Sequence, residues 1–156
     1  MKPDLNTDPN ADRTDRRTWM GLLARAPERD VLSLWEAFAD KPGFQWLRAP
    51  EVGTTMVRGR MGATGAPFNL GEMTVTRCSL SLADGAVGHA YVQGRSKAKA
   101  EAAALIDALM QTARAGDVRA GILTPLQDRD TAAKSARARK AAATKVEFFT
   151  LVRGED

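Results

Sequence analysis

The segment from Tyr91 to Lys97 combines residue types that bind anions. It is a predicted strand that ends in Gly94, followed by Arg95 and by Ser96 at the start of a predicted helix. The first backbone N–H groups of a helix lack partners within the helix, and its dipole is positive at that end. Gly94 permits close approach, and the cations add charge. The segment indicates an anion or partner contact, but it lacks P-loop spacing, and an ordinary connection with solvated cations is the alternative.

A second candidate is the glycine-rich stretch 59–68. Its glycines recur every three residues and no helix pattern follows, so it does not match a dinucleotide-binding fingerprint. We interpret it as a long connection between two strands. Long loops on a rigid sheet often contact a substrate or a partner, and a simple flexible turn is the alternative. The residues predicted to make such contacts are Arg60, Thr64 and Gly65.

Catalytic groups are scarce, because the chain has one cysteine, Cys78, and one histidine, His89. A single cysteine excludes an internal disulfide and a metal site built from several thiolates of this chain. Cys78 falls within a strand pattern, and His89 is interpreted as a structural histidine rather than a base. We therefore predict no catalytic residue and no metal site. An autonomous phosphate-ester enzyme that uses His89 is the weaker alternative.

The charge distribution favours anionic partners. The chain has 23 basic and 19 acidic residues, a net charge of +4. Residues 114–145 alone contain eight basic and three acidic residues. A free-standing nucleic-acid-binding domain is the main alternative function, but this segment has no aromatic residue on which bases could stack, so binding of nucleic acid is disfavoured.

The length of 156 residues, with 44% hydrophobic residues, suits one domain. Residues 1–13 are polar and are predicted to be a disordered lead-in, so the domain spans residues 14–156. Two short amphipathic helices are expected, one near Trp19 to Ala26 and one from Pro27 to Phe38. The chain has no apolar run of about 18 residues and its start is too polar for a signal peptide, so we expect a cytoplasmic protein without a membrane segment.

From residue 44 the pattern changes to strands, expected at 44–48, 53–61, 72–82 and 86–94. Asp84-Gly85 is a turn signal between the last two. A long helix with an apolar stripe begins at Ser96. These elements predict an α+β fold in which an antiparallel β-meander packs against helices, with one face of the sheet buried.

The C-terminal part has two unusual segments. After a predicted loop at 116–125, Asp128 is expected to cap a helix that ends near Ala143, but residues 129–145 contain no large apolar side chain. The last segment is apolar on both alternating faces, as a covered strand would be. It either inserts into the domain's own sheet or pairs with another subunit, and its predicted partner-interface residues are Val146, Phe148, Phe149, Leu151 and Val152.

Several blocks of the sequence together resemble the PhnG family of the carbon–phosphorus lyase system. They read RMGATG (60–65), GEMTVTR (71–77), VQGRSK (92–97), ALIDALMQ (104–111) and VEFFTLVRG (146–154), together with Trp19-Met20 and Pro125-Leu126. The resemblance covers nearly all of the chain after residue 14. It implies organic phosphonate catabolism in a bacterial cytoplasm, within a core complex of PhnH, PhnI and PhnJ subunits that works with PhnL.

The resemblance also implies a reaction. An alkylphosphonate oxygen attacks C1′ of a purine nucleoside triphosphate, expels the base and leaves ribose 1-alkylphosphonate 5-triphosphate. PhnI is the usual candidate to house this step, and the iron–sulfur subunit PhnJ cleaves the carbon–phosphorus bond. The PhnG-like chain then has no cofactor or catalytic residue of its own, and in isolation it is expected to self-associate. The Arg95 helix start and the Arg60 loop would hold the polyanionic substrates or PhnI.

Overall fold

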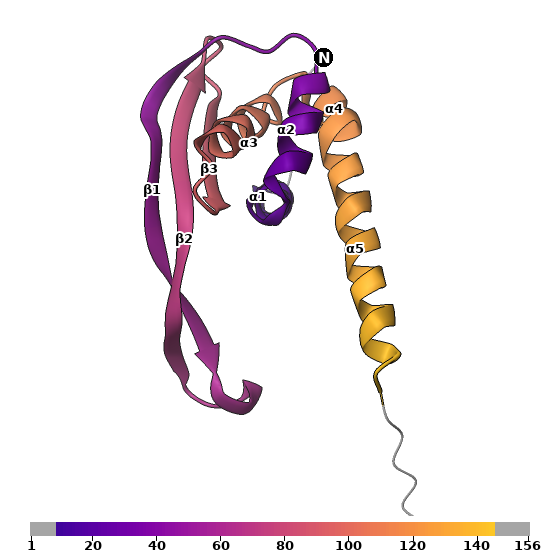
Figure 1. The fold of residues 1–156 in the computed structure, drawn as a ribbon. Coiled ribbons are helices and arrows are strands. Elements are labelled where there is room, and N and C mark those ends of the chain that lie inside the picture. The colour runs from indigo at the N-terminus through magenta and orange to yellow at the C-terminus, as the bar shows by residue number, and fades with distance from the viewer. Residues whose placement is uncertain (1–8, 146–156) are drawn as a thin grey trace, which may run out of the picture.

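The computed structural model describes residues 9–145, with side chains from residue 13 onward. Within these residues three strands form one sheet, and helices cover part of one face of it (Figure 1). The predicted α+β class with an antiparallel meander is confirmed. In chain order the elements are α1 (Pro9–Arg25), α2 (Glu28–Ala37), β1 (Phe44–Arg60), a 3₁₀ turn η1 (Met61–Ala63), β2 (Pro67–Leu82), β3 (Val87–Gln93), α3 (Lys97–Leu109), α4 (Ala115–Val118), a π-helical turn η2 (Arg119–Leu123) and α5 (Thr124–Ala142).

The sheet has the order β1-β2-β3, and both pairs of strands are antiparallel. The strands expected at 44–48 and 53–61 are one strand, β1, which pairs with β2 from Phe44 opposite Leu82 to Arg60 opposite Pro67. The register shifts between residues 46 and 51, where Pro50 lies. Proline cannot donate to a strand ladder and is tolerated at an edge or a bulge, so an irregularity takes up the proline without ending the strand.

The half of the sheet near α3 has the predicted alternation of buried and outward residues. Cys78, Leu80 and Leu82 are buried on β2, and Gly88 and Val92 are buried on β3. A Cβ atom added at Gly88 would lie 1.9 Å from the backbone oxygen of Ala104 in α3. Glycine at this position therefore lets the backbone of α3 approach the sheet closely.

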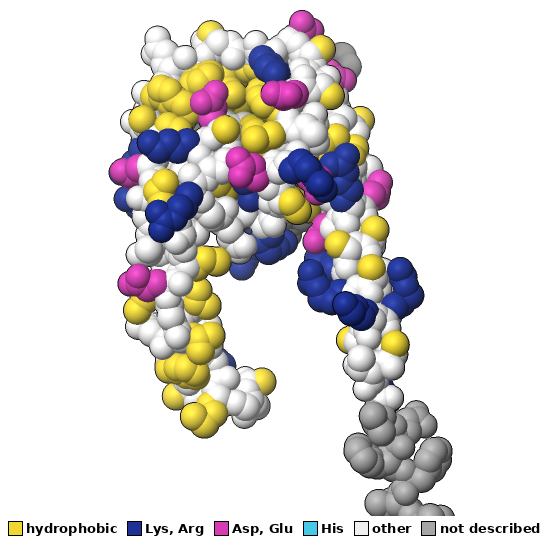
Figure 2. All heavy atoms as spheres, in the orientation of Figure 1, with side chains coloured by type: hydrophobic (Ala, Val, Ile, Leu, Met, Phe, Trp, Pro, Cys, Tyr) yellow, Lys and Arg dark blue, Asp and Glu magenta, His cyan; other side chains and the backbone are white. Residues whose placement is uncertain are grey.

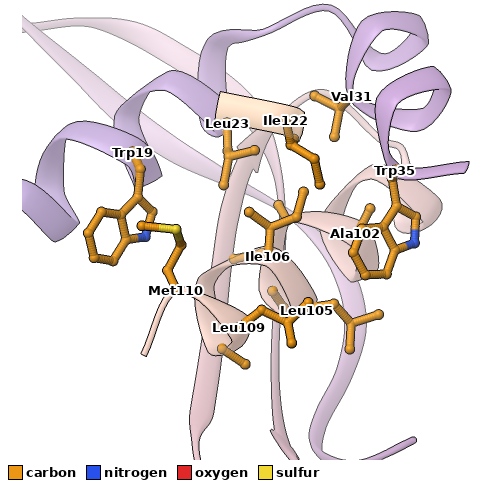
Figure 3. Packing of buried hydrophobic residues seen from close by; sticks show 14 of the residues in the cluster. Trp19, Leu23, Val31, Trp35, Ala102, Leu105, Ile106, Leu109, Met110 and Ile122 are labelled. Carbon is orange, nitrogen blue, oxygen red and sulfur yellow. The ribbon is translucent and has the colours of Figure 1, made fainter. Parts of the chain in front are cut away.

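Helix α3 is covered on nearly all sides, with ten of its thirteen residues buried. It lies between the sheet and helices α1 and α2 (Figure 1). In Figure 3, side chains from α1, α2, α3 and η2 converge on one cluster, which includes Trp19, Leu23, Val31, Trp35, Leu105, Ile106, Leu109 and Ile122. The many alanines of α3 explain this packing, since small side chains allow neighbours to approach from several directions.

Helix α1 begins at Pro9, five residues before the predicted start of the domain. Residues 9–13 are therefore helical rather than part of a disordered lead-in. Proline favours the first helical position because its fixed φ suits the helix and its missing N–H is not needed there. Residues 1–8 of the predicted lead-in lie outside the described residues.

The predicted loop at 116–125 is wrong, because α4, η2 and α5 follow one another there without an extended connection. Val118, Ile122, Leu123 and Leu126 are buried along this run, at helical spacing. Gly116, Gly121 and Pro125 had suggested a loop, but Pro125 lies in the first turn of α5, where proline is tolerated. Asp128 consequently lies inside α5 and does not cap it.

Two parts of the chain extend away from the packed body. The hairpin arm, residues 51–73, is the outer half of the β1–β2 ribbon, and the α5 extension, residues 131–142, is the exposed end of the last helix (Figures 1 and 2). The α5 extension ends near the predicted boundary and buries none of its side chains, as its lack of large apolar residues predicts. None of the described helices is long and apolar enough to cross a membrane.

Candidate functional site

The predicted anion segment lies at the start of α3, where Ser96 and Glu28 of α2 form hydrogen bonds. Gly94 has φ +95°, a conformation that favours glycine. Ser96 caps α3, because its Oγ accepts the Lys99 N–H at 3.0 Å and donates to Glu28 Oε1 at 2.6 Å. The Glu28 carboxylate and the Ser96 hydroxyl therefore already lie at the N-terminus of α3. Arg95 and Lys97 are exposed and make no ion pair within the described residues.

The hairpin tip at residues 60–65 is also internally bonded. The Arg60 guanidinium donates to the Gly65 carbonyl oxygen at 2.9 Å. A Cβ atom at Gly65 would lie 2.8 Å from the Met61 oxygen, so glycine is required to close the tip. Thr64 Oγ1 lies 3.5 Å from the Gly62 oxygen, at the limit of a hydrogen bond. These contacts show that the glycines are needed for the geometry of the turn. The Nη2 atom of Arg60 has no hydrogen bond within the described residues.

The structure does not bring these two segments together. Gln93, next to Gly94, pairs with Val75 on β2, whereas the tip follows the pair of Arg60 and Pro67. Eight residues of β2 separate these positions, about 26 Å at the usual rise of a strand. One small ligand cannot contact both segments of the same chain.

Cys78 and His89 do not form a catalytic pair. Cys78 is buried, its Sγ donates to the Ala100 oxygen, and burial, with a smaller effect of Glu101, raises its pKa to about 12. A thiol that stays protonated at neutral pH is a poor nucleophile. The exposed His89 ring has its Nδ1 2.8 Å from Ser79 Oγ, but no carboxylate orients the ring among the contacts of the described residues. Catalytic dyads depend on such an orienting group.

Asp107 is a fully buried carboxylate that the sequence pattern did not single out. It accepts hydrogen bonds from Arg16 Nε and Nη2 at 3.1 and 2.7 Å, from Trp19 Nε1 at 2.9 Å and from the His89 backbone N–H at 2.9 Å. The group thus joins α1, β3 and α3 at one point. The sequence does contain a signal for this group, because Asp107 is an acidic residue among the apolar residues of a predicted helix. A buried charge requires partners.

Lys99 is a second buried charge. Only 3% of its surface is exposed, and its Nζ donates to the Ala24 oxygen of α1 at 2.9 Å. Burial lowers its pKa, and the nearby Glu28 partly opposes this effect. Lys99 and Asp107 therefore both fix α1 on α3. No cluster of His, Cys, Asp and Glu within residues 9–145 could hold a metal ion.

The hairpin arm carries large apolar side chains in the open. Met56 is 51% exposed, Phe68 44% and Leu70 67%, and Figure 2 shows hydrophobic side chains gathered along the hairpin arm. Contiguous exposed apolar residues are typical of protein interfaces. The sequence predicts the arm only as strands and a loop. The sequence signal for this surface is the presence of apolar residues on both sides of the glycine-rich turn. None of the helices predicted from the sequence was expected to cover them.

The α5 extension contrasts with the arm. Its exposed side chains include Lys134, Arg137, Arg139 and Lys140, and Figure 2 shows the basic groups on this leg. The predicted interface residues Val146, Phe148, Phe149, Leu151 and Val152 follow α5 and lie outside the described residues. The two parts that extend from the body are thus an apolar ribbon and a basic helix. Buried Cys78, Asp107 and Lys99 make hydrogen bonds within the fold.

Comparison with known proteins gives a consistent result. The family described as phosphonate metabolism protein PhnG matches residues 14–154. The chain is also 43% identical, over 156 residues and the full length of both proteins, to a Rhizobium meliloti (strain 1021) protein named alpha-D-ribose 1-methylphosphonate 5-triphosphate synthase subunit PhnG.

Proposed function

Since this chain belongs to the PhnG family of phosphonate metabolism proteins, we propose that it is a non-catalytic subunit of the complex that makes ribose 1-methylphosphonate 5-triphosphate. The complex transfers ribose triphosphate from a purine nucleoside triphosphate to an alkylphosphonate and releases the base. Both compounds are substrates of the complex, and this chain contributes no cofactor. The named subunit relative, similar over its full length, supports this assignment.

The observation that carries the proposal is the exposed apolar surface of the hairpin arm. A two-stranded ribbon without a covering layer is marginally stable in water, and this one exposes Met56, Phe68 and Leu70. Burial of these side chains against a partner would remove the exposed apolar area from water. The arm has the properties of a surface that another subunit covers.

The proposed partners are PhnI, PhnH and PhnJ-like subunits, with PhnL acting alongside them, in the cytoplasm. The arm and the segment with Val146, Phe148, Phe149, Leu151 and Val152 are the proposed contacts. Arg95 and Lys97 are exposed cations that would contact a partner or a substrate. If the catalytic residues lie on a partner subunit, this chain does not need Cys78 and His89 to form a catalytic pair.

The test is co-expression with the PhnI-like, PhnH-like and PhnJ-like chains of the same organism. We expect the isolated chain to self-associate or aggregate and to become monodisperse in the complex, as measured by size-exclusion chromatography with light scattering. The variant Phe68→Ser/Leu70→Ser should lower recovery of the complex at least about tenfold, since it removes apolar contacts from the interface. Arg58→Ser, an exposed residue on the same arm, is the control and should assemble normally.

A monodisperse monomer that does not co-purify with the other subunits would contradict the proposal. Binding of DNA by that monomer, with a steep dependence on salt, would instead favour the nucleic-acid alternative. Release of the purine base from a nucleoside triphosphate by the isolated chain, free of other proteins, would contradict the non-catalytic assignment.

A further inference from the structure

Helix α1 and the edge strand β3 border an open cleft of about 460 Å³ that no feature of the sequence suggested. Its inner wall is apolar and includes Met20, Leu23 and Ala24 of α1, Val92 of β3 and Ala103 of α3. This volume and this lining are typical of sites for small molecules.

Three arginines of α1 border the cleft, and two of them form no ion pair within the described residues. Arg13, Arg16 and Arg17 are spaced i, i+3 and i+4, which places them on one face of the helix. Arg16 is neutralised by Asp107 at 2.7 Å. Arg13 and Arg17 have neither an ion pair nor a hydrogen bond within the described residues, and no acidic side chain lines the cleft. The cleft therefore has, beside an apolar wall, two positive charges that no described acidic side chain compensates.

Strand β3 also lines the cleft, and two of its lining residues, His89 and Tyr91, are exposed. Tyr91 lines the cleft and is half exposed, and its side chain has an aromatic ring and a hydroxyl group. His89 also lines the cleft, and its Nδ1 is engaged by Ser79, which leaves Nε2 as the other polar atom of the ring. An aromatic ring beside paired arginines suits a ligand that has both a flat part and an anionic part.

The free edge of β3 could in principle accept an extended peptide, but side chains already occupy part of it. The His89 N–H donates to Asp107, and the Val87 carbonyl oxygen accepts from Arg16 Nη2 at 3.3 Å and from Gln111 Nε2 at 2.8 Å. Side chains that use edge groups in this way block the addition of a strand. Only the short end of β3 near Tyr91 is left, so the site favours a compact ligand over a peptide strand.

We propose that this cleft binds a nucleoside polyphosphate, with its phosphates on Arg13 and Arg17 and its base or sugar against Tyr91 and the apolar wall. The proposal rests on the proposed function, because the relative's name identifies a ribose triphosphate as product. Two arginines one helical turn apart match a chain of phosphates, since each guanidinium can bind phosphate oxygens through two N–H groups. The chain thereby helps to capture the substrate whose chemistry occurs on a partner.

The test is photolabelling of the co-expressed complex with 8-azido-ATP, followed by mass spectrometry of the peptides of this chain. We expect label in the peptide that contains Tyr91, and competition by excess ATP. Arg13→Ala/Arg17→Ala should reduce labelling of that peptide about tenfold or more, because it removes both phosphate-binding groups. The matched control is Arg25→Ala/Arg29→Ala, which removes the same charge near the end of α1 and the start of α2, outside the cleft.

Two further measurements distinguish contacts to the base from contacts to the phosphates. Inorganic triphosphate should compete at least about tenfold less well than ATP, because it lacks a group to contact Tyr91 and the apolar wall. Tyr91→Ala should weaken competition by ATP and leave competition by triphosphate unchanged. Circular dichroism melting of each variant chain checks that its fold is retained.

Three outcomes would overturn the proposal: absence of label from this chain, equal loss of label in the control variant, or equal competition by triphosphate and ATP. Loss of subunit assembly by Arg13→Ala/Arg17→Ala without a change in labelling would show that the cleft contacts a protein. All of these leave the assembly test of the proposed function intact. Conversely, a complex that does not form contradicts the proposed function, and the isolated chain can still be labelled.

Discussion

The packed body and the hairpin arm are made from the same two strands, but they use their residues in opposite ways. Near α3, β2 alternates buried and outward residues, and helices cover its inner face. In the arm, the same strand exposes Phe68 and Leu70 on a ribbon that none of the described helices covers. The body thus contains the described interactions that stabilise the chain, and the arm exposes apolar area that no other described part of the chain covers. Substitutions in the two regions should therefore affect different measurements.

Glycine-to-alanine substitutions give the largest expected contrast. Gly88→Ala places a methyl group against the Ala104 carbonyl oxygen, so α3 has to move off the sheet. We expect the free energy of unfolding to fall by about 3 kcal/mol, or folding to fail. Gly53→Ala in the arm has no atom within 4 Å of the added carbon and should change stability by less than about 0.5 kcal/mol. Urea unfolding monitored by tryptophan fluorescence measures both, and similar losses would contradict the contrast.

Carboxylates give the second contrast. Asp107→Asn removes the charge that Arg16, Trp19 and His89 share, and we expect a loss of about 3 kcal/mol. The value is at the low end for a buried pair because the Arg16 side chain is 34% exposed. Asp128→Asn in α5 replaces an exposed carboxylate and should be nearly neutral. Thermal melts followed by circular dichroism would detect the difference, and a wild-type melting temperature for Asp107→Asn would refute it.

The dependence of stability on pH gives the smallest contrast. In the unfolded chain the thiol of Cys78 has its ordinary pKa of 9.0, whereas burial raises the folded value to about 12. Below pH 9 the thiol is protonated in both states. From pH 9 toward pH 12 the unfolded thiol loses its proton and the folded one retains it, so stability falls as pH rises, by up to about 1.4 kcal/mol per pH unit.

Cys78→Ala should remove this part of the slope, which unfolding curves of both proteins at pH 8, 9 and 10 would measure. The difference between the two slopes isolates the thiol from the lysines that titrate in the same range. Identical slopes would show that Cys78 ionises as easily in the body as in the unfolded chain. A thiol reagent should accordingly modify Cys78 in the wild-type protein only as the body unfolds.

Sequence periodicity predicted the strands of the body well because the relevant signal is local. Cys78, Leu80 and Leu82 alternate with polar residues, and the turn at Asp84-Gly85 joins β2 to β3 as expected. The same rule failed at 116–125, since Gly116, Gly121 and Pro125 concealed the apolar spacing of Val118, Ile122 and Leu126. Packing against α2 outweighed the low helix propensity of glycine.

The candidate site was less predictable than the fold. Arg95 and Arg60 were identified because they stand beside glycines, but both glycine segments are also explained by turn geometry. Arg13 was missed because the polar residues around it predicted disorder. The structure shows that α1 includes Arg13. Hydrogen bonds from Arg16 to Asp107 and to the Val87 oxygen hold α1 beside α3 and β3.

The sequence by itself determined the α+β class, the alternation of β2 and β3, the exposed end of α5, and the membership in the PhnG family that its ordered motifs indicate. These properties depend on neighbours within a few residues or on the order of motifs. Only the tertiary structure decided which charges are buried together, which apolar residues stay uncovered, and that α1 and β3 enclose a cationic cleft. Arg16 and Asp107 are 91 positions apart in the chain, so their contact depends on how the helices pack on the sheet, and no local periodicity contains that information.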